Sequence, residues 1–136
     1  MTTPKTVLAQ AIFDLVIEKA AAMPRQCISG DGICCLRDSN GNACFLGQIM
    51  SDDEVRPNGR LINGSADGLL QRGELPERYR DHVDLIELLQ GVHDDLGNWT
   101  LGGSADKVEM RSEFLSIASA YGFNTRTLDQ HFPAGA

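Results

Sequence analysis

The dipeptide Asn40-Gly41, which lies between two apolar runs, restricts the fold of this chain more than any other feature. Both residues tolerate positive φ, and Asn-Gly between apolar runs is among the strongest short-range signals for a β-hairpin. The flanking runs predict strands at about residues 33–37 and 42–46, and residues 26–29 could add a third strand. We therefore expect a short antiparallel hairpin or a three-stranded sheet here.

Helical periodicity surrounds that segment on both sides. Apolar residues recur at spacings of three and four over residues 4–23, which predicts a helix that Pro24 ends. The same period predicts helices at about 76–96 and from an N-cap at Ser104 to a left-handed C-cap at Gly122, followed by a turn at 125–131. No repeat or low-complexity linker divides the chain, so we expect a single α+β domain over residues 1–136, with two to three C-terminal helices packed on the hairpin.

Residues 51–75 are polar and rich in Gly, Asn and Asp. They predict a long connection with one short helix at 66–71, which Ser65 caps. Connections of this length are often functional. The segment is therefore a candidate lid or binding loop.

Charge is unevenly distributed along the chain. The net charge is −7, from 12 basic and 19 acidic residues, which opposes non-specific nucleic-acid binding and favours a basic protein partner. From Asp81 to Asp106 there is no Lys or Arg at all. A solvated helix face explains this pattern, and so does an acidic surface that binds a positively charged partner. The candidate partner-binding residues are Asp81, Asp84, Glu87, Asp94 and Asp95.

The four cysteines, Cys27, Cys34, Cys35 and Cys44, lack the closely spaced pairs that structural zinc sites use. Cysteine in the thiol form is commonly buried as a small hydrophobe, so we expect hairpin packing. Either Cys34 or Cys35 should share a strand face with Cys44, depending on the hairpin register. The alternative is a zinc or redox module that uses all four cysteines. We expect no cofactor and no bound metal.

A second alternative is a small-ligand binder or an enzyme. Its pocket would lie between the hairpin and the His93 helix, with Arg37, Cys44 and His93 as polar contacts. A cysteine nucleophile needs a base that a third group orients. Adjacent helical residues point about 100° apart, so we expect Asp94 to orient His93 poorly. We therefore predict no catalytic residue, a core position for His93, and either an ion pair to the acidic helix or an anionic ligand for Arg37.

No segment approaches the roughly 20 apolar residues that span a bilayer. The apolar stretch from Val7 to Ile17 is interrupted by Asp14 and followed by Glu18, which argues against a signal peptide. We expect a cytoplasmic protein that does not bind membranes. The sequence does not indicate an oligomeric state.

Two stretches, "CLRDSNGNACFLGQIMSDDE" and "LIELLQGVHDDLGNW", resemble small uncharacterised proteins of tailed phages and prophages. That family pairs a Cys-x-x-Arg-x-x-x-Gly-x-x-Cys-x-x-Gly hairpin with a Leu-Gln-x-x-His-Asp helix. The matching residues here are Cys34, Arg37, Gly41, Cys44 and Gly47, then Leu89, Gln90, His93 and Asp94. The resemblance implies no established activity, but it does imply a phage or mobile-element origin. We therefore expect a non-enzymatic inhibitor of a host or defence complex, such as an anti-CRISPR, acting on a host protein or ribonucleoprotein with a basic surface.

Overall fold

The computed structural model describes residues 5–27, 36–38 and 42–134. These residues form α-helices and short 3₁₀ helices, and they contain no β-strand. The expected α+β fold with a hairpin is therefore wrong, because the described part of the chain is helical. The elements are α1 (Lys5–Ala22), α2 (Phe45–Ile49), α3 (Asp52–Val55), α4 (Ala66–Gln71), η1 (Glu77–His82), α5 (Val83–Asp94), η2 (Leu96–Asn98), α6 (Lys107–Tyr121) and α7 (Arg126–His131).

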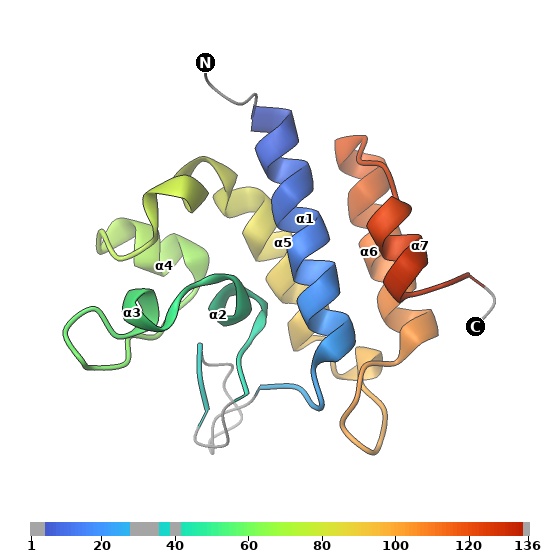
Figure 1. Cartoon of the computed structure of the whole chain (residues 1–136), viewed down its shortest axis with the longest axis horizontal. Helices are drawn as coiled ribbons and strands as arrows, with labels where there is room; N and C mark the ends of the chain where they lie inside the picture. Colours follow the sequence, from blue (N-terminus) through green and yellow to red (C-terminus); the bar gives the residue numbers. More distant parts are fainter. Residues whose placement is uncertain (1–4, 28–35, 39–41, 135–136) are drawn as a thin grey trace.

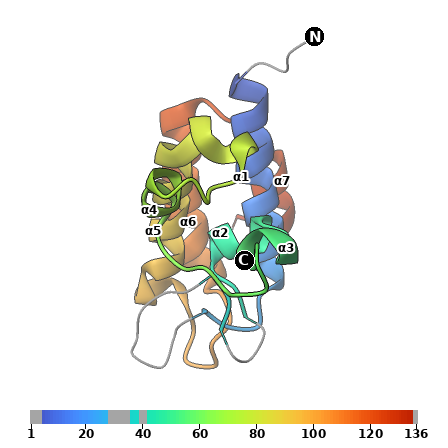
Figure 2. The same ribbon diagram turned by 90° about the vertical axis from the view of Figure 1, so that its left-hand side faces the viewer.

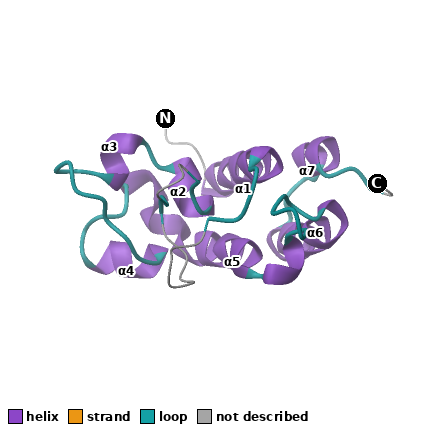
Figure 3. Cartoon of the chain, turned by 90° about the horizontal axis from the view of Figure 1, so that it is seen from below, coloured by secondary structure: helices purple, strands orange, loops and turns teal. Residues whose placement is uncertain are grey.

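The helices form two layers (Figures 2 and 3). One layer contains α2, α1 and α7, and α1 contacts both of its neighbours (Figure 1). The other contains α4, α5 and α6, and α5 contacts both of its neighbours. Across the layers, α1 and α2 pack on α5, and α6 packs on α7. In the part of the chain that the structure describes, every helix is too short or too polar to cross a lipid bilayer.

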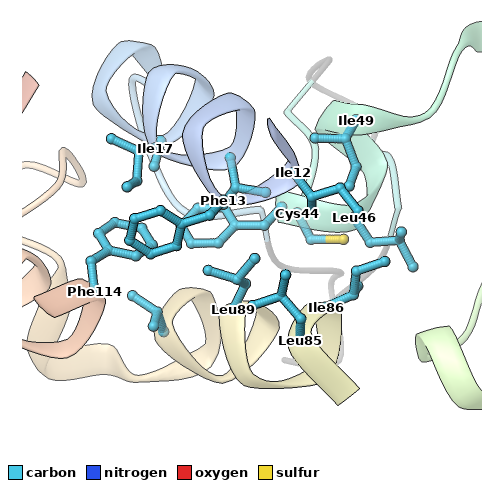
Figure 4. Packing of buried hydrophobic residues seen from close by; sticks show 14 of the residues in the cluster. Ile12, Phe13, Ile17, Cys44, Leu46, Ile49, Leu85, Ile86, Leu89 and Phe114 are labelled. Carbon is cyan, nitrogen blue, oxygen red and sulfur yellow. The ribbon is translucent and has the colours of Figure 1, made fainter. Parts of the chain in front are cut away.

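Phenylalanine rings occupy the centre between the layers. Phe13, Phe45, Phe114 and Phe132 are each at most 1% exposed. The Phe114 ring centroid lies 6.2 Å from that of Phe13, 6.0 Å from Phe45 and 5.6 Å from Phe132. Figure 4 shows aliphatic side chains of α1, α2 and α5 packed around the rings of Phe13 and Phe114. Aromatic burial of this kind dominates core energetics, so it supplies much of the stability of the helical arrangement.

The second predicted strand, at residues 42–46, does not form: residues 42–44 are irregular, and α2 begins at Phe45. Asp38 and Asn42 first bind each other: the Asp38 N–H donates to Asn42 O at 2.9 Å, and the Asp38 carboxylate accepts from Asn42 N at 2.9 Å. Cys44 then acts as the N-cap of α2, and its Sγ accepts the Gly47 N–H at 3.4 Å. An apolar run that is buried on all sides fits a buried helix as well as a strand, which is why periodicity misassigned it.

Gly47 explains how α2 packs against residues 36–38. A Cβ at position 47 would lie 2.1 Å from Leu36 O, so only glycine permits this close approach. The Arg37 guanidinium donates to Gly47 O and to Met50 O, the latter at 3.3 Å. These contacts satisfy carbonyls that the end of a helix leaves without partners. Cys34 and Cys35, on which the predicted strand register depends, lie outside the described residues, and Cys44 lies on no strand.

Several helical predictions are confirmed. α1 and α7 lie within a residue of where the sequence predicts them, and α4 begins after Ser65, whose Oγ accepts the Gly68 N–H at 3.1 Å. Gly122 has φ of 71°, as expected of a left-handed C-cap. The predicted 51–75 loop is more structured than expected, because it also contains α3.

Two helix boundaries differ from the prediction. The expected helix at 76–96 is divided into η1, α5 and η2. Ser104 is not the N-cap of α6, because Asp106 caps this helix and accepts the N–H groups of Val108 and Glu109, both at 3.1 Å. Ser104 instead accepts the Thr100 N–H at 2.7 Å and closes the turn between η2 and α6.

Candidate functional site

The three predicted pocket residues are engaged in internal contacts. Arg37 is 15% exposed at its side chain, and Cys44 and His93 are 3% and 0% exposed. The expected ion pair between Arg37 and the acidic helix is wrong, because Arg37 pairs with Asp52 of α3 at 3.3 Å. Each of the three side chains therefore has a structural role in holding α2 or the start of α3.

His93 is a buried core histidine, as predicted. Its Nε2 accepts the Cys27 N–H at 3.3 Å. Because an imidazole nitrogen that accepts carries no proton, the proton lies on Nδ1 and is donated to Asp94 Oδ1 at 2.9 Å. The expectation that Asp94 orients this ring poorly is therefore wrong: the Asp94 carboxylate reaches back to the Nδ1 edge despite the angle between adjacent helical residues.

Gln90, His93 and Asp94 of α5 form a junction between α5 and α2. The Gln90 Oε1 accepts the Leu46 N–H at 3.2 Å, and its Nε2 donates to Asp94 Oδ1 at 3.1 Å. The His93 carbonyl accepts from Gln26 Nε2 at 2.7 Å and from Trp99 Nε1 at 2.8 Å. These side chains therefore hold α5 against α2 and against the segments that contain Gln26 and Trp99.

No three His, Cys, Asp or Glu side chains of the described residues are grouped as metal ligands. Cys27 Sγ lies 3.4 Å from Asn42 O, and Cys44 Sγ contacts Gly47 N at the same distance. Cys34 and Cys35, the other two members of the alternative zinc or redox module, fall outside the described ranges.

The predicted acidic residues lie near the end of η1, along α5 and directly after α5. Asp84, Glu87 and Asp94 recur at helical spacing, and Asp95 and Asp81 flank them. Some of these carboxylates also hold neighbouring structure. Glu87 accepts the Asp67 N–H of α4 at 2.9 Å, Asp94 orients His93, and Asp95 accepts the Gly97 N–H at 2.9 Å. Asp84 is exposed, as are Asp81, Asp94 and Asp95.

Two acidic residues of α6, Glu109 and Glu113, join this surface and were missed at the level of sequence. Burial raises the pKa of Glu113, as do a side-chain hydrogen bond to Asp95 and the charges of Asp95 and Glu109. Asp84 similarly raises the pKa of Tyr121 at the other end of α6, after the larger effect of burial. No local signal links these positions, because they lie on two antiparallel helices. We call Asp84, Asp95, Glu109 and Glu113 the α5–α6 acidic surface.

The basic residues of α6 bind α7 and not this surface. Lys107 Nζ donates to His131 O at 3.3 Å and lies 4.4 Å from the centroid of the Phe132 ring. Arg111 donates to Phe132 O at 2.6 Å and pairs with Asp129 at 2.9 Å. The cations of α6 therefore contact α7, whereas Glu113 lies close to the carboxylates of Asp95 and Glu109.

The predicted binding loop, residues 51–75, is held by ion pairs. Arg78 of η1 binds both carboxylate oxygens of Glu54, at 2.5 and 2.8 Å, which lowers the pKa of Glu54 to about 2. Arg72 pairs with Glu74 at 2.6 Å. An open hollow of about 550 Å³ lies beside this segment, with Asp53, Glu74, Glu77 and Arg80 among its lining residues. Its charged lining is mostly acidic, but Glu54 and Glu74 are already paired with Arg78 and Arg72.

No protein-family model, curated protein or solved structure matches this chain. Function is therefore inferred from the chain's own surface chemistry.

Proposed function

We propose that this protein is a non-enzymatic, cytoplasmic binding protein whose α5–α6 acidic surface engages a basic partner. The observation that carries the proposal is the crowding of carboxylates between α5 and α6, where Asp95 and Glu109 help to raise the pKa of Glu113. A Lys or Arg side chain from a partner would relieve this repulsion, since Lys107 and Arg111 bind α7. Binding would then lower an electrostatic cost that the free protein carries.

The chemistry of the surface favours a protein or ribonucleoprotein partner with a basic face. The net charge of −7 opposes direct contact with nucleic-acid phosphates. Complementary charge raises association rates and gives specificity more than it gives affinity. The resemblance to phage and prophage proteins favours a host or defence complex, so inhibition of such a complex is the activity to test first.

The experiment uses Asp84→Asn with Glu109→Gln, because both side chains are exposed and their loss removes no cap or core contact of the described structure. We expect the double variant to weaken binding of a basic host protein by roughly 3- to 10-fold at low salt, and less at high salt. Pull-down from host lysate identifies the protein, and titration calorimetry of the purified pair at two salt concentrations then measures the change.

The matched control is Asp53→Asn with Glu77→Gln, two exposed acids on the α3 side that change the net charge equally. The control should bind like the wild type. Equal affinity for the wild type and both double variants would refute the proposal, and equal weakening would indicate an effect of net charge alone.

A further inference from the structure

A row of uncharged side chains follows the outward side of α6, which stands at one end of the layer that also contains α4 and α5 (Figure 3). Val108 and Leu115 are about two helical turns apart, so they share one side of the helix with Ser112 and Ser119. Val108 is 58% exposed, Leu115 is 42% exposed, and both serines are exposed. We call these four residues the outer stripe of α6.

The outer stripe lies opposite the buried side of the same helix. That buried side consists of Met110, Phe114, Ile117 and Ala118. Exposed helices of globular proteins usually carry charged side chains on the side opposite their core. The charges of α6 lie instead on its flanks, because Lys107 and Arg111 contact α7 and Glu113 lies close to Asp95. A further helix can therefore pack on the outer stripe without burying a charged group.

Large and small side chains alternate along the outer stripe, in the order Val108, Ser112, Leu115 and Ser119. A second copy of α6 can run antiparallel to the first, with a two-fold axis between Ser112 and Leu115. Val108 then lies opposite Ser119 of the second copy, and Leu115 lies opposite its Ser112. Each large side chain meets a small one, which is the pattern that lets facing helices interdigitate. Because every contact of a two-fold interface occurs twice, the outer stripe is complementary to itself.

The charges beside the stripe are compatible with this arrangement. Glu109 lies opposite Ala118 of the second copy, and Arg111, which already pairs with Asp129 at 2.9 Å, lies opposite its Ser116. The two copies of Glu109 are then about nine residues apart along the helices, or roughly 13 Å, which exceeds the Debye length of about 10 Å. The net charge of −7 opposes close approach of two copies elsewhere, so an uncharged stripe is where they can meet.

We propose that the outer stripe of α6 is a self-association site, on which α6 of a second copy of this chain packs antiparallel. The 15 residues of α6 make a helix about 22 Å long and about 10 Å wide, which covers roughly 220 Å² per copy. Stable complexes bury about 800 Å² per partner, so the dimer is weak, with a Kd on the order of 100 μM. The inference does not rest on the proposed function, because the stripe shares no residue with the α5–α6 acidic surface.

Sedimentation equilibrium of the full-length protein tests this inference. The weight-average mass should rise from the monomer value of 14.8 kDa toward twice that value between about 10 μM and about 1 mM protein. Leu115→Lys should weaken association by about tenfold or more, because the interface would bury an unpaired charge, and should leave thermal unfolding unchanged. Leu88→Lys on α5, where the leucine is 49% exposed, is the matched control and should associate like the wild type. A monomer at every concentration, or equal effects of the two lysine variants, overturns the inference.

Variants of side-chain size test the antiparallel register. Ser112→Leu places a second large side chain opposite Leu115, so it should weaken association by about tenfold. Ser112→Leu combined with Leu115→Ser exchanges the large and small positions, and it should restore association to within about threefold of the wild type. A non-specific apolar patch would instead associate more strongly after Ser112→Leu, because its apolar area grows. That result, or no recovery in the double variant, contradicts the register and overturns the inference.

Two further outcomes would assign the outer stripe to a different occupant. The first is a monomer that binds vesicles of phosphatidylcholine and loses this binding in Leu115→Lys, which would mean that the stripe contacts lipid. The second is a monomer that captures another protein from a lysate and loses it in the same variant. Either outcome overturns self-association.

Discussion

Two contacts in the molecule, one between α3 and η1 and the other between α5 and α6, hold carboxylates in opposite electrostatic settings. On the side of α3 and η1, Glu54 meets Arg78, and its pKa falls to about 2. On the side of α6, burial raises the pKa of Glu113, and the neighbouring Asp95 and Glu109 raise it further. The difference therefore comes from the Arg78 that Glu54 contacts and from the burial and the carboxylates around Glu113.

In the first region the carboxylates form ion pairs with arginines of the same chain, whereas in the second they lie beside other carboxylates. Arg37, Arg72 and Arg78 each pair with a carboxylate in the α2–α4 region and tie loops to helices. Exposed pairs of this kind contribute at most about 1 kcal/mol each. The α5–α6 acidic surface has no comparable internal cation from α6, so its charge is the more available for a partner.

The largest expected effect on stability comes from a substitution in α2, where Arg37 contacts the end of the helix. Gly47→Ala should destabilise the protein by about 3 kcal/mol, because its Cβ would lie 2.1 Å from Leu36 O and α2 would have to move away from Arg37. Urea unfolding measures the change. The control is Gly91→Ala on the exposed side of α5, where a Cβ meets nothing within 4 Å. It should stabilise by up to about 1 kcal/mol, and similar behaviour of both variants would contradict the packing described for α2.

A smaller effect should follow from Glu54→Gln, which removes the ion pair with Arg78. The folded-state pKa of Glu54 is lowered from 4.5 to about 2. Its contribution is therefore present above the unfolded pKa and lost as pH falls through the folded one. Because Arg78 is 51% exposed, we expect a loss of only about 1 kcal/mol at pH 7. Thermal unfolding between pH 2 and pH 7 should show the wild type and the variant converging in acid, and a constant difference would refute the pairing.

Glu113→Gln should change the free energy of unfolding least, and it should stabilise the protein where Gly47→Ala and Glu54→Gln destabilise it. The folded-state pKa of Glu113 is raised, so its favourable contribution is full below the ordinary value of 4.5 and is lost as pH rises through the raised value. Removing the charge should therefore stabilise the protein at pH 7 by about 0.5 kcal/mol, a surface-sized effect. Unfolding measured from pH 4 to pH 7 should show a flatter profile for the variant. The Glu113 carboxylate also hydrogen-bonds to the Asn98 side chain, which lowers its pKa. Destabilisation of the variant at pH 7 would mean that this hydrogen bond outweighs the repulsion from Asp95 and Glu109.

Local pattern was sufficient where an element depends on its own residues. The helical period predicts α1, Ser65 marks the start of α4, and Gly122 marks the end of α6, because caps and periodicity act over one or two turns. The acidic character of the 81–106 stretch is likewise visible in composition alone. The sequence also shows the leucines of that stretch, but it does not indicate which of them are exposed to solvent.

Contacts between distant segments determined the rest. Residues 42–46 lead into a helix because Gly47 can approach Leu36 and because Arg37 satisfies the end of α2. Neither effect is local to the run. Likewise, Glu113 joins Asp95 only because α5 and α6 pack side by side. The sequence by itself determined helical periodicity, caps and total charge. The tertiary structure alone decided the conformation of the apolar run and which charges meet, because both depend on approaches between residues far apart in the chain.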